Sequence, residues 1–488
     1  MKKFYQLLLL IVIKIKTFVD MLKNSIKVII LICIAILSLF LRKRDYAQIP
    51  IPGQSTDEYS NSWVGLSLIE TGMPIGISGL PNYQNETKEY VNVDRFTQYL
   101  SSDPLTLNYP WMDHPPLLGL ITGGYAYTQG ARVFEDTIAL FIRRPIILIS
   151  TISVALIMIY CWLNFGFLSA IVSGLIYGTT PLIVLSGRMV QSENAIIPMF
   201  LLTMIFISQY IKSKKDHWLI LAALASGVAT LFKLTGFVCY LFVFLSLLNY
   251  YHNFTKQFFK DFFFYLLIAL PVTSLFLIYG SVYGLKHFFN IFLSNSHRFY
   301  GIGPSAIFDL IRQQRLTQHK FLPEVWIVVS WIVSFTYFLK KKIKYKIIVP
   351  FVALISYLII YVFFGSQPYG WYAFPFWPIL IIVFSHFFIT SLKKCRQFYL
   401  LIINLIIVLG VNISRIVGIF EFQPYSKYWR FGVSFILFIG IIYFLINKIK
   451  INKNLKTAIS LILFGFSIYL NLIYLNKINI DFWWQNIS

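Results

Sequence analysis

The sequence is poor in charged residues, and especially in acids. Only 12% of its 488 residues are Asp, Glu, Lys or Arg, with 19 acids against 42 bases, whereas a soluble domain is about 25% charged. Hydrophobic residues make up 58% of the chain, and the mean hydropathy is +0.70. This composition excludes a water-soluble globule and a disordered tail, and it indicates a polytopic membrane protein.

Cysteines and processing signals are also scarce. The four cysteines have no Cys-x-x-Cys spacing, which is evidence against a disulfide framework and a zinc site. No small-residue cleavage site follows the first long apolar run, so we expect a retained first span. There is no internal repeat, low-complexity tract or separate soluble stretch. We therefore predict a single membrane domain over residues 1–488.

Long apolar runs are abundant. A helix that crosses the bilayer core needs about 17–25 mostly apolar residues. The sequence predicts an all-α polytopic membrane protein with about 13 transmembrane helices and interfacial helices in a long first external loop. The predicted spans are 26–41, 141–163, 166–187, 194–211, 217–232, 234–251, 260–283, 322–340, 347–364, 373–390, 398–417, 431–447 and 457–475.

The segment 115–130 decides the orientation of the chain. It is short for a span and contains Gly119, Gly123 and Gly124. If it does not cross and the N-terminus is cytoplasmic, all the basic clusters between spans lie inside, as the positive-inside rule requires. We therefore predict an interfacial helix on the outer surface at 115–130. The two large external loops are then 42–140 and 284–321.

The net charge of +23 is explained by this orientation. Nearly all of the excess falls on segments predicted to lie inside, and the external segments are almost balanced. In a soluble protein such an excess would suggest nucleic acid. In this membrane protein we expect membrane lipids as partners and no nucleic-acid partner.

The first external loop, 42–140, contains two notable patterns. Ser55 and Glu58 have the spacing of a capping box, and they predict a helix that extends to Glu70. At the other end, Asp113-His114-Pro115-Pro116-Leu117 leads into the interfacial helix, where two prolines favour a helix start. Taken alone, the acids at 57–58 could simply favour the positive end of a helix dipole, and the prolines could be turn chemistry.

Together and in this order, these patterns resemble the GT-C membrane glycosyltransferases, in particular the group of protein O-mannosyltransferases and lipid A aminoarabinose transferases. The resemblance rests on an N-terminal span, an Asp-Glu pair that opens a helix, a following Gly-x-Pro and a His-Pro-Pro-Leu. Further matches are Arg143-Arg144-Pro145, Thr180-Pro181 with Ser186-Gly187-Arg188 and Glu193, Lys233-Leu234-Thr235-Gly236, and Tyr372-Ala373-Phe374-Pro375. Glu193 stands where the family usually has Asp, and Trp371 where it often has Arg.

The resemblance implies transfer of a sugar from a polyprenyl-phosphate donor to an acceptor hydroxyl on the outer, extracytoplasmic face, with inversion. It implies Asp57 as the general base. The side chains that it implies for binding of donor phosphate or substrate are Glu58, Asp113, His114, Arg143, Arg188, Glu193 and Lys233. For the basic side chains, the alternative is that they reach lipid headgroups from the ends of spans.

A divalent metal ion is a further possibility. Asp113 and His114 alone are too few ligands, and His287, His297 or Glu193 could complete a site. The basic loop 284–321 suits a lid over an anionic lipid head. Trp371, Tyr372 and Trp377 are interpreted as an interfacial aromatic belt.

A multi-pass transporter or flippase is the rival function. It predicts ionisable groups in the middle of spans, or broken helices in paired halves. The sequence has no symmetry between its halves, and Glu324 and His386 lie near span ends. The donor sugar, the acceptor and the oligomeric state have no readable signature.

Overall fold

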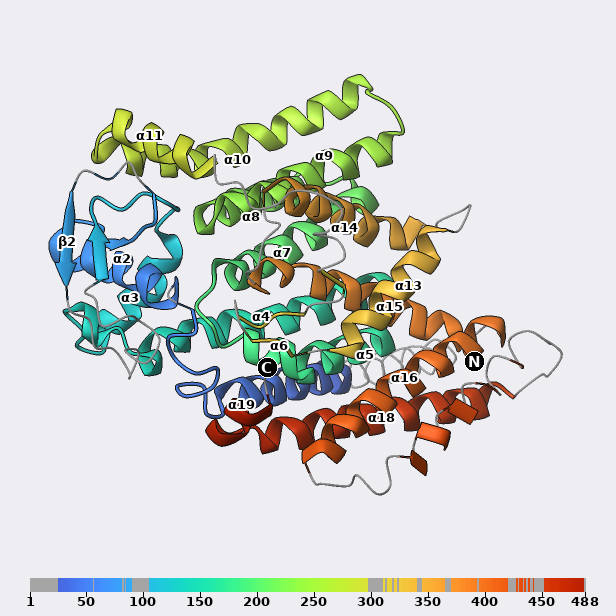
Figure 1. Ribbon diagram of the computed structural model, residues 1–488. Coiled ribbons are helices and arrows are strands. Elements are labelled where there is room, and N and C mark those ends of the chain that lie inside the picture. Colours follow the sequence, from blue (N-terminus) through green and yellow to red (C-terminus); the bar gives the residue numbers. More distant parts are fainter. Residues whose placement is uncertain are drawn as a thin grey trace, which may run out of the picture.

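The computed structural model describes residues 25–486, apart from gaps at 56, 81–82, 84, 90–104, 297–309, 312–313, 318–319, 323, 340–344, 365–369, 393–394, 420–426, 429, 433, 436–437, 439–441 and 443–451. In this part the chain is predominantly helical, and most of its long helices run in broadly the same direction through one bundle (Figure 1). The predicted all-α membrane fold is confirmed.

Eight described helices are long and apolar enough to cross a membrane by length and composition. They are Ser25–Lys43, α4 (Ala139–Phe165), α7 (Ser192–Ser213), η3 with α9 (Leu234–Tyr251), α10 (Lys256–Val282), η4 with α15 (Gly370–Ser391), α16 (Cys395–Ile419) and α18 (Lys453–Lys477). Four shorter apolar helices coincide with other predicted spans. They are α5 (Phe167–Thr179), α8 (Asp216–Phe232), α13 (Val325–Phe338) and α14 (Tyr345–Phe364). The predicted span 431–447 lies largely outside the described residues, so the count of thirteen stays a prediction.

One predicted span is divided in two. The run 166–187 forms α5 and then α6 (Pro181–Ser186), and Thr180 between them has an extended backbone. A residue before proline is driven out of the helical region by the proline ring. The apolar run alone did not reveal this break.

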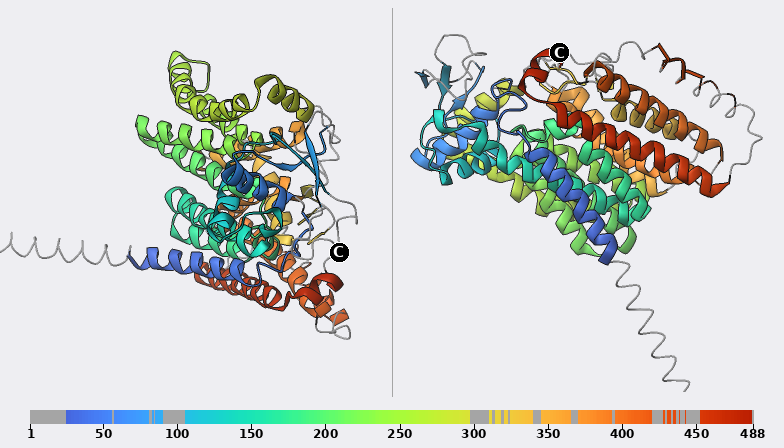
Figure 2. Two further views of the ribbon diagram at one scale, coloured as in Figure 1. Left: turned by 90° about the vertical axis from the view of Figure 1, so that its left-hand side faces the viewer. Right: turned by 90° about the horizontal axis from the view of Figure 1, so that it is seen from below.

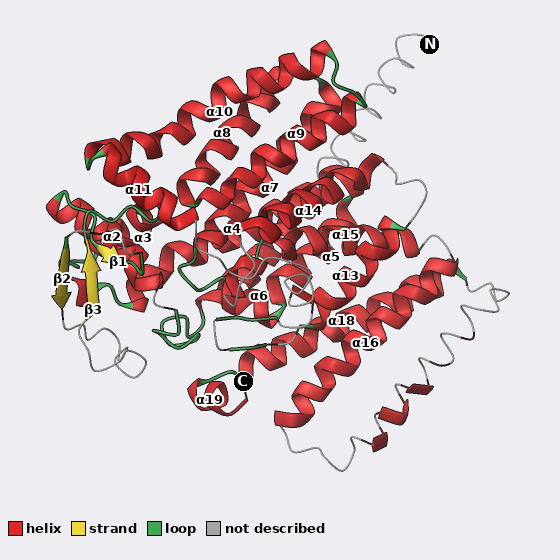
Figure 3. Ribbon diagram, turned by 45° about the horizontal axis from the view of Figure 1, so that its top comes forward, coloured by secondary structure: helices red, strands yellow, loops and turns green. Residues whose placement is uncertain are grey.

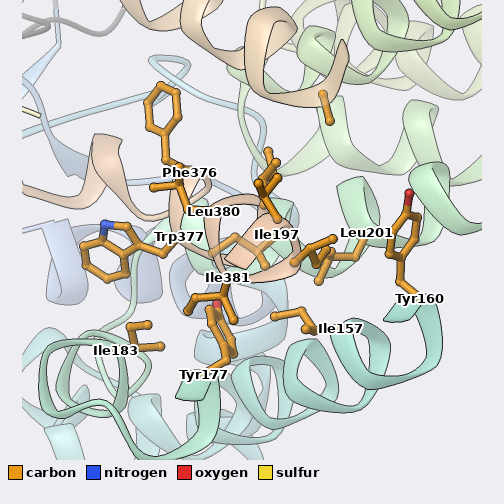
Figure 4. Close-up of a cluster of buried hydrophobic side chains, with 14 of the residues drawn as sticks. Ile157, Tyr160, Tyr177, Ile183, Ile197, Leu201, Phe376, Trp377, Leu380 and Ile381 are labelled. Atoms are coloured by element: carbon orange, nitrogen blue, oxygen red, sulfur yellow. The ribbon is translucent and has the colours of Figure 1, made fainter. Parts of the chain in front are cut away.

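Helix α15 (Phe376–Ser391) is the centre of the bundle. Every residue from Phe376 to Phe388 is buried, as expected for a helix that is apolar on all sides. Figure 4 shows part of the core around it, where α15 meets side chains of α4, α5, α6 and α7. The labelled side chains are Ile157, Tyr160, Tyr177, Ile183, Ile197, Leu201, Phe376, Trp377, Leu380 and Ile381.

The described part of 42–140, the predicted first external loop, folds into a small layer at one end of the bundle (Figures 1 and 3). It contains α2 (Asp57–Thr71), α3 (Leu117–Thr128) and a three-stranded antiparallel sheet of order β1-β3-β2. The strands are β1 (Gly76–Ile77), β2 (Glu86–Glu89) and β3 (Leu105–Asn108). The sequence did not predict this sheet. Helix α11 (Leu285–Ser296), from the second external loop, lies at the same end.

The first and last long helices are neighbours. Ser25–Lys43 runs beside α18 in both views of Figure 2, and Arg44 donates to the carbonyl of Asn476 over 3.1 Å. Helix α19 (Ile480–Asn486) then follows α18. The N-terminal span is therefore part of the bundle and not a detached anchor.

Helices α2 and α3 cross at glycines. A Cβ at Gly65 would lie 1.9 Å from the carbonyl carbon of Gly119, and one at Gly123 would lie 2.1 Å from the carbonyl oxygen of Ser62. The hydroxyls of Ser62 and Thr122 are 2.9 Å apart across the same contact. Helix α3 has 12 residues and is not among the apolar helices that could span, in agreement with the prediction for 115–130. The glycines serve the close approach of two helices.

This crossing yields a matched pair of variants. Gly123→Ala is expected to destabilise the protein by about 1–3 kcal/mol, because its methyl group meets the rigid backbone of Ser62. Gly124→Ala is the control, since the nearest atom there is the flexible tip of Ile69 at 3.3 Å, and alanine favours a helix by up to about 1 kcal/mol. Thermal unfolding in detergent measures both. Equal stability of the two variants would contradict the tight crossing.

Candidate active site

Lys233 is the centre of a charged group at the end of the bundle that carries the external loops. Its ammonium Nζ lies 2.7 Å from Oε1 of Glu193 and 4.3 Å from the centroid of the Tyr372 ring. The Lys233 side chain is 10% exposed and that of Glu193 is fully buried. The other oxygen of Glu193, Oε2, has no hydrogen-bond partner among the described residues.

Asp57, the predicted base, belongs to this group. It is the first residue of α2, is half-buried, and is close enough to act on Lys233 electrostatically. Burial disfavours the charged ammonium, but the charge of Glu193, the neighbouring Tyr372, the hydrogen bond to Glu193 and, last, the charge of Asp57 together outweigh it and raise the pKa of Lys233 above its ordinary value. Lys233 is therefore a fixed cation beside Glu193. The structure therefore pairs Glu193 with Lys233 and places Asp57 within electrostatic range of Lys233.

A glycine turn holds Lys233 in place. Lys233 is extended between α8 and the short helix η3 (Leu234–Phe237), and the amide of Gly236 donates to the Lys233 carbonyl over 2.8 Å. A Cβ at Gly236 would lie 2.4 Å from the backbone of Ala229. The Lys-x-x-Gly pattern thus has a steric reason, because only glycine lets the chain fold back so closely on α8.

Asp113 joins the two external loops. It is 6% exposed, and its carboxylate accepts hydrogen bonds from Ser78 (2.7 Å) and from the Tyr83 hydroxyl (2.8 Å). Its backbone carbonyl accepts from Asn295 of α11 over 2.8 Å. Burial and the charge of Asp113 together raise the pKa of Tyr83. His114 follows, with its ring edge-on to Trp111.

The described residues contain no group that would form the metal site considered as a possibility from the sequence. Nowhere in the described ranges do three His, Cys, Asp or Glu side chains form a group that could hold a metal ion. His287 packs edge-on against Tyr83, at 5.8 Å between ring centres, and Glu193 is paired with Lys233. His297 lies outside the described residues. No step of the chemistry below depends on a metal.

Glu58 and Arg143 pair with each other, contrary to the expected contact with substrate. Arg143 Nε lies 2.8 Å from Glu58 Oε2, and Nη2 lies 2.7 Å from Oε1. Nη1 donates to the carbonyls of Tyr46 and Pro50, while Glu58 also accepts from the amide of Val190. The two side chains are at most 1% exposed. This ion pair therefore fixes the position of the start of α2, where Asp57 lies. Among the described residues, the Glu58 carboxylate makes no capping-box contact with Ser55.

Arg188 is also occupied inside the protein. It is 4% exposed and donates to the carbonyls of Leu41 and Ile49, each over 2.8 Å. Arg42 is fully buried and donates to the carbonyls of Tyr177 and Gly178 at the end of α5. Helix C-termini leave carbonyls unsatisfied and partly negative. These guanidinium groups stabilise helix ends, and the expected phosphate contact of Arg188 does not fit this geometry.

The aromatic side chains near α15 are not an interfacial belt. Trp371 and Trp377 are 4% and 2% exposed and belong to the core, and the Tyr372 ring covers Lys233. In the sequence, the Tyr-x-x-Pro pattern is the feature that points to Tyr372. By contrast, Ser78 and Tyr83, the partners of Asp113, follow no readable pattern in the sequence.

Comparisons with known proteins agree with this arrangement. The family described as Dolichyl-phosphate-mannose-protein mannosyltransferase matches residues 113–279, about a third of the chain. No curated protein has significant sequence similarity to the chain.

Solved structures are similar along nearly the whole chain. ArnT from Cupriavidus metallidurans in the apo state gives a TM-score of 0.55 at 12% identity, over 93% of this chain and 75% of that one. The same protein bound to undecaprenyl phosphate gives 0.51 at 12% identity, over 92% and 74%. Arabinosyltransferase EmbB from Mycobacterium smegmatis gives 0.54 at 10% identity, over 91% and 40%. The chain therefore has the fold of the GT-C glycosyltransferases, as its motifs predicted.

Proposed function

We propose that the protein is a glycosyltransferase that moves a sugar from a polyprenyl-phosphate donor to an acceptor hydroxyl of a lipid, glycan or protein. The observation that carries the proposal is the grouping of Asp57 with the buried Lys233–Glu193 pair at the loop-bearing end of a GT-C fold. The family match names a dolichyl-phosphate-mannose enzyme, and one similar structure is bound to undecaprenyl phosphate. Both favour a donor of this class.

Asp57 is proposed as the general base. Its carboxylate takes the proton of the acceptor hydroxyl, and the hydroxyl oxygen forms a bond to the anomeric carbon of the sugar. The bond between that carbon and the phosphate oxygen breaks, and the lipid phosphate leaves with the electron pair. Because the hydroxyl attacks opposite the leaving phosphate, the configuration inverts. A base of this kind contributes about 10²–10⁴-fold to the rate.

Lys233 and His114 are the proposed contacts of the donor phosphate. The Lys233 ammonium would stabilise the negative charge that develops as the phosphate leaves. Oε2 of Glu193 is a buried acceptor to which no described residue donates. Asp113 positions His114 by joining the two external loops.

We propose that the N-terminus is cytoplasmic and that this site is extracytoplasmic. The reason is the positive-inside rule applied to the basic loops. A topology reporter placed after Gly130 is expected to signal from outside, and one placed after Lys346 from inside. An outside signal at Lys346 would overturn the orientation.

The proposed activity is tested with the purified protein. It is incubated with a panel of polyprenyl-phosphate sugars and acceptor extracts, and the products are read by mass spectrometry. A new glycosidic bond on an acceptor supports the proposal. Translocation of a lipid-linked sugar in vesicles, without any new bond, would contradict it and favour a flippase.

A further inference from the structure

A hairpin in the second external loop lies outside the catalytic group described above. We call the described residues 314–317 and 320–322 the clamp hairpin. Arg315 and Phe321 form an antiparallel bridge, the amide of Leu322 donates to the carbonyl of Gln314 over 3.1 Å, and that of Leu316 donates to Lys320 over 2.8 Å. The sequence predicted a basic lid here, with no indication of regular structure.

The clamp hairpin packs directly against η4 (Gly370–Ala373), which contains Tyr372. Gly370 is buried, and a Cβ there would lie 2.2 Å from the carbonyl oxygen of Arg315 and 2.5 Å from its carbonyl carbon. The contact is therefore between two backbones, which cannot give way as a side chain could. On its other side, η4 is held by the Tyr357 hydroxyl, which donates to the Tyr372 carbonyl over 3.0 Å.

A buried ion pair anchors the base of the clamp hairpin. Glu324, at the start of α13, is 1% exposed, and its Oε2 lies 3.1 Å from Nη1 of Arg415 in α16. The amide of Glu324 donates to the Gln314 side chain, so the pair is tied to the first residue of the hairpin. Arg415 also faces the ring of Tyr474 in α18, at 5.7 Å.

A buried pair of this kind is a weak source of stability, because desolvation offsets most of the attraction. The ion pair does fix the relative positions of the two side chains. The contacts run without a break from Arg415 to Glu324, to the hairpin, to Gly370, and from there to the Tyr372 ring over Lys233. Two helices of the C-terminal half are thereby connected to the proposed catalytic group.

We infer that the clamp hairpin is a positioning element of the active site, which holds Tyr372 over Lys233, and that Gly370, Glu324 and Arg415 are its positioning residues. The inference rests on the proposed glycosyltransferase function for its effect on turnover. Its geometric content is independent of that function. Tyr372 in turn confines the Lys233 ammonium to the position from which it acts on Glu193 and Asp57.

A fluorine label tests the geometry directly. 3-Fluorotyrosine is introduced at position 372 alone, and its ¹⁹F shift is recorded in the purified full chain. Lys233→Met supplies the shift of the ring without its cation. Glu324→Gln and Gly370→Ala are each expected to move the signal toward that reference. The controls are Asp481→Asn, an exposed acid on α19, and Gly465→Ala, which has no atom within 4 Å of its Cβ.

Turnover is the second readout. If transfer is detected, Glu324→Gln and Gly370→Ala are expected to lower kcat on the order of tenfold, because small misplacements of reacting groups are costly. Unchanged ¹⁹F shifts in both variants would overturn the inference, even if activity falls. Shifts that move as expected in a protein without transferase activity would support the positioning element and refute the proposed function.

Discussion

The variant Asp57→Asn is expected to abolish sugar transfer while the protein still folds and inserts. Asparagine keeps the size of the side chain but cannot accept the acceptor's proton, so turnover should fall by about 10²–10⁴-fold. Product formation from the active polyprenyl-phosphate donor, followed by mass spectrometry, measures the loss. Thermal unfolding shows whether the fold is intact.

Asp481→Asn is the matched control for this variant. Asp481 is an exposed acid in α19, so its neutralisation should leave turnover unchanged. The pH profile of turnover is a further test, because the base must be ionised for catalysis. Normal turnover by Asp57→Asn would eliminate Asp57 as the base and would leave Glu193 as the carboxylate of the group around Lys233.

The variant Arg143→Met is expected to produce the largest loss of stability. It leaves the carboxylate of Glu58 buried without its cation, and breaking such a pair costs about 3–5 kcal/mol. Thermal or denaturant unfolding in detergent measures the change. The double variant Glu58→Gln with Arg143→Met should recover part of the loss, because no unpaired charge remains.

Arg144→Met is the matched control, since Arg144 is the next residue of α4. Its guanidinium donates to the hydroxyls of Tyr46 and Tyr125, and such bonds contribute about 1 kcal/mol each. A stable Arg143→Met variant with a raised KM for the donor would show instead that Arg143 binds phosphate. That result would overturn the supporting role assigned to the pair.

The sequence predicted some features that depend only on local chemistry. Apolar length placed the helices, because a bilayer requires it wherever a chain crosses. The shortness and glycines of 115–130 predicted a short helix and no span there; the structure has the 12-residue α3, and its place at the membrane surface stays a prediction. Motif order identified the GT-C fold. Asp57, Glu193 and Lys233 were named from their motifs; Glu193 and Lys233 are in contact, and Asp57 acts on Lys233 through its charge.

Predictions about individual arginines and aromatic residues were less successful. Arg143 and Arg188 carry the charge that a phosphate site needs, but nothing in their motifs says whether a carboxylate or a helix end has already engaged them. Trp371 and Trp377 are of the residue type that is common in interfacial belts, but in the structure they are core residues. Such choices depend on contacts between residues far apart in the chain.

The sequence by itself determined that this is a helical membrane protein, where most of its helices lie and which motifs its external loops carry. These properties follow from the hydrophobicity, length and order of short segments, which do not require knowledge of distant neighbours. Only the tertiary structure decided which charged side chains gather around Lys233 and which are used to hold the fold. Pairing in a low-dielectric interior is decided by distance in space, and Glu58 meets Arg143 across 85 residues of sequence.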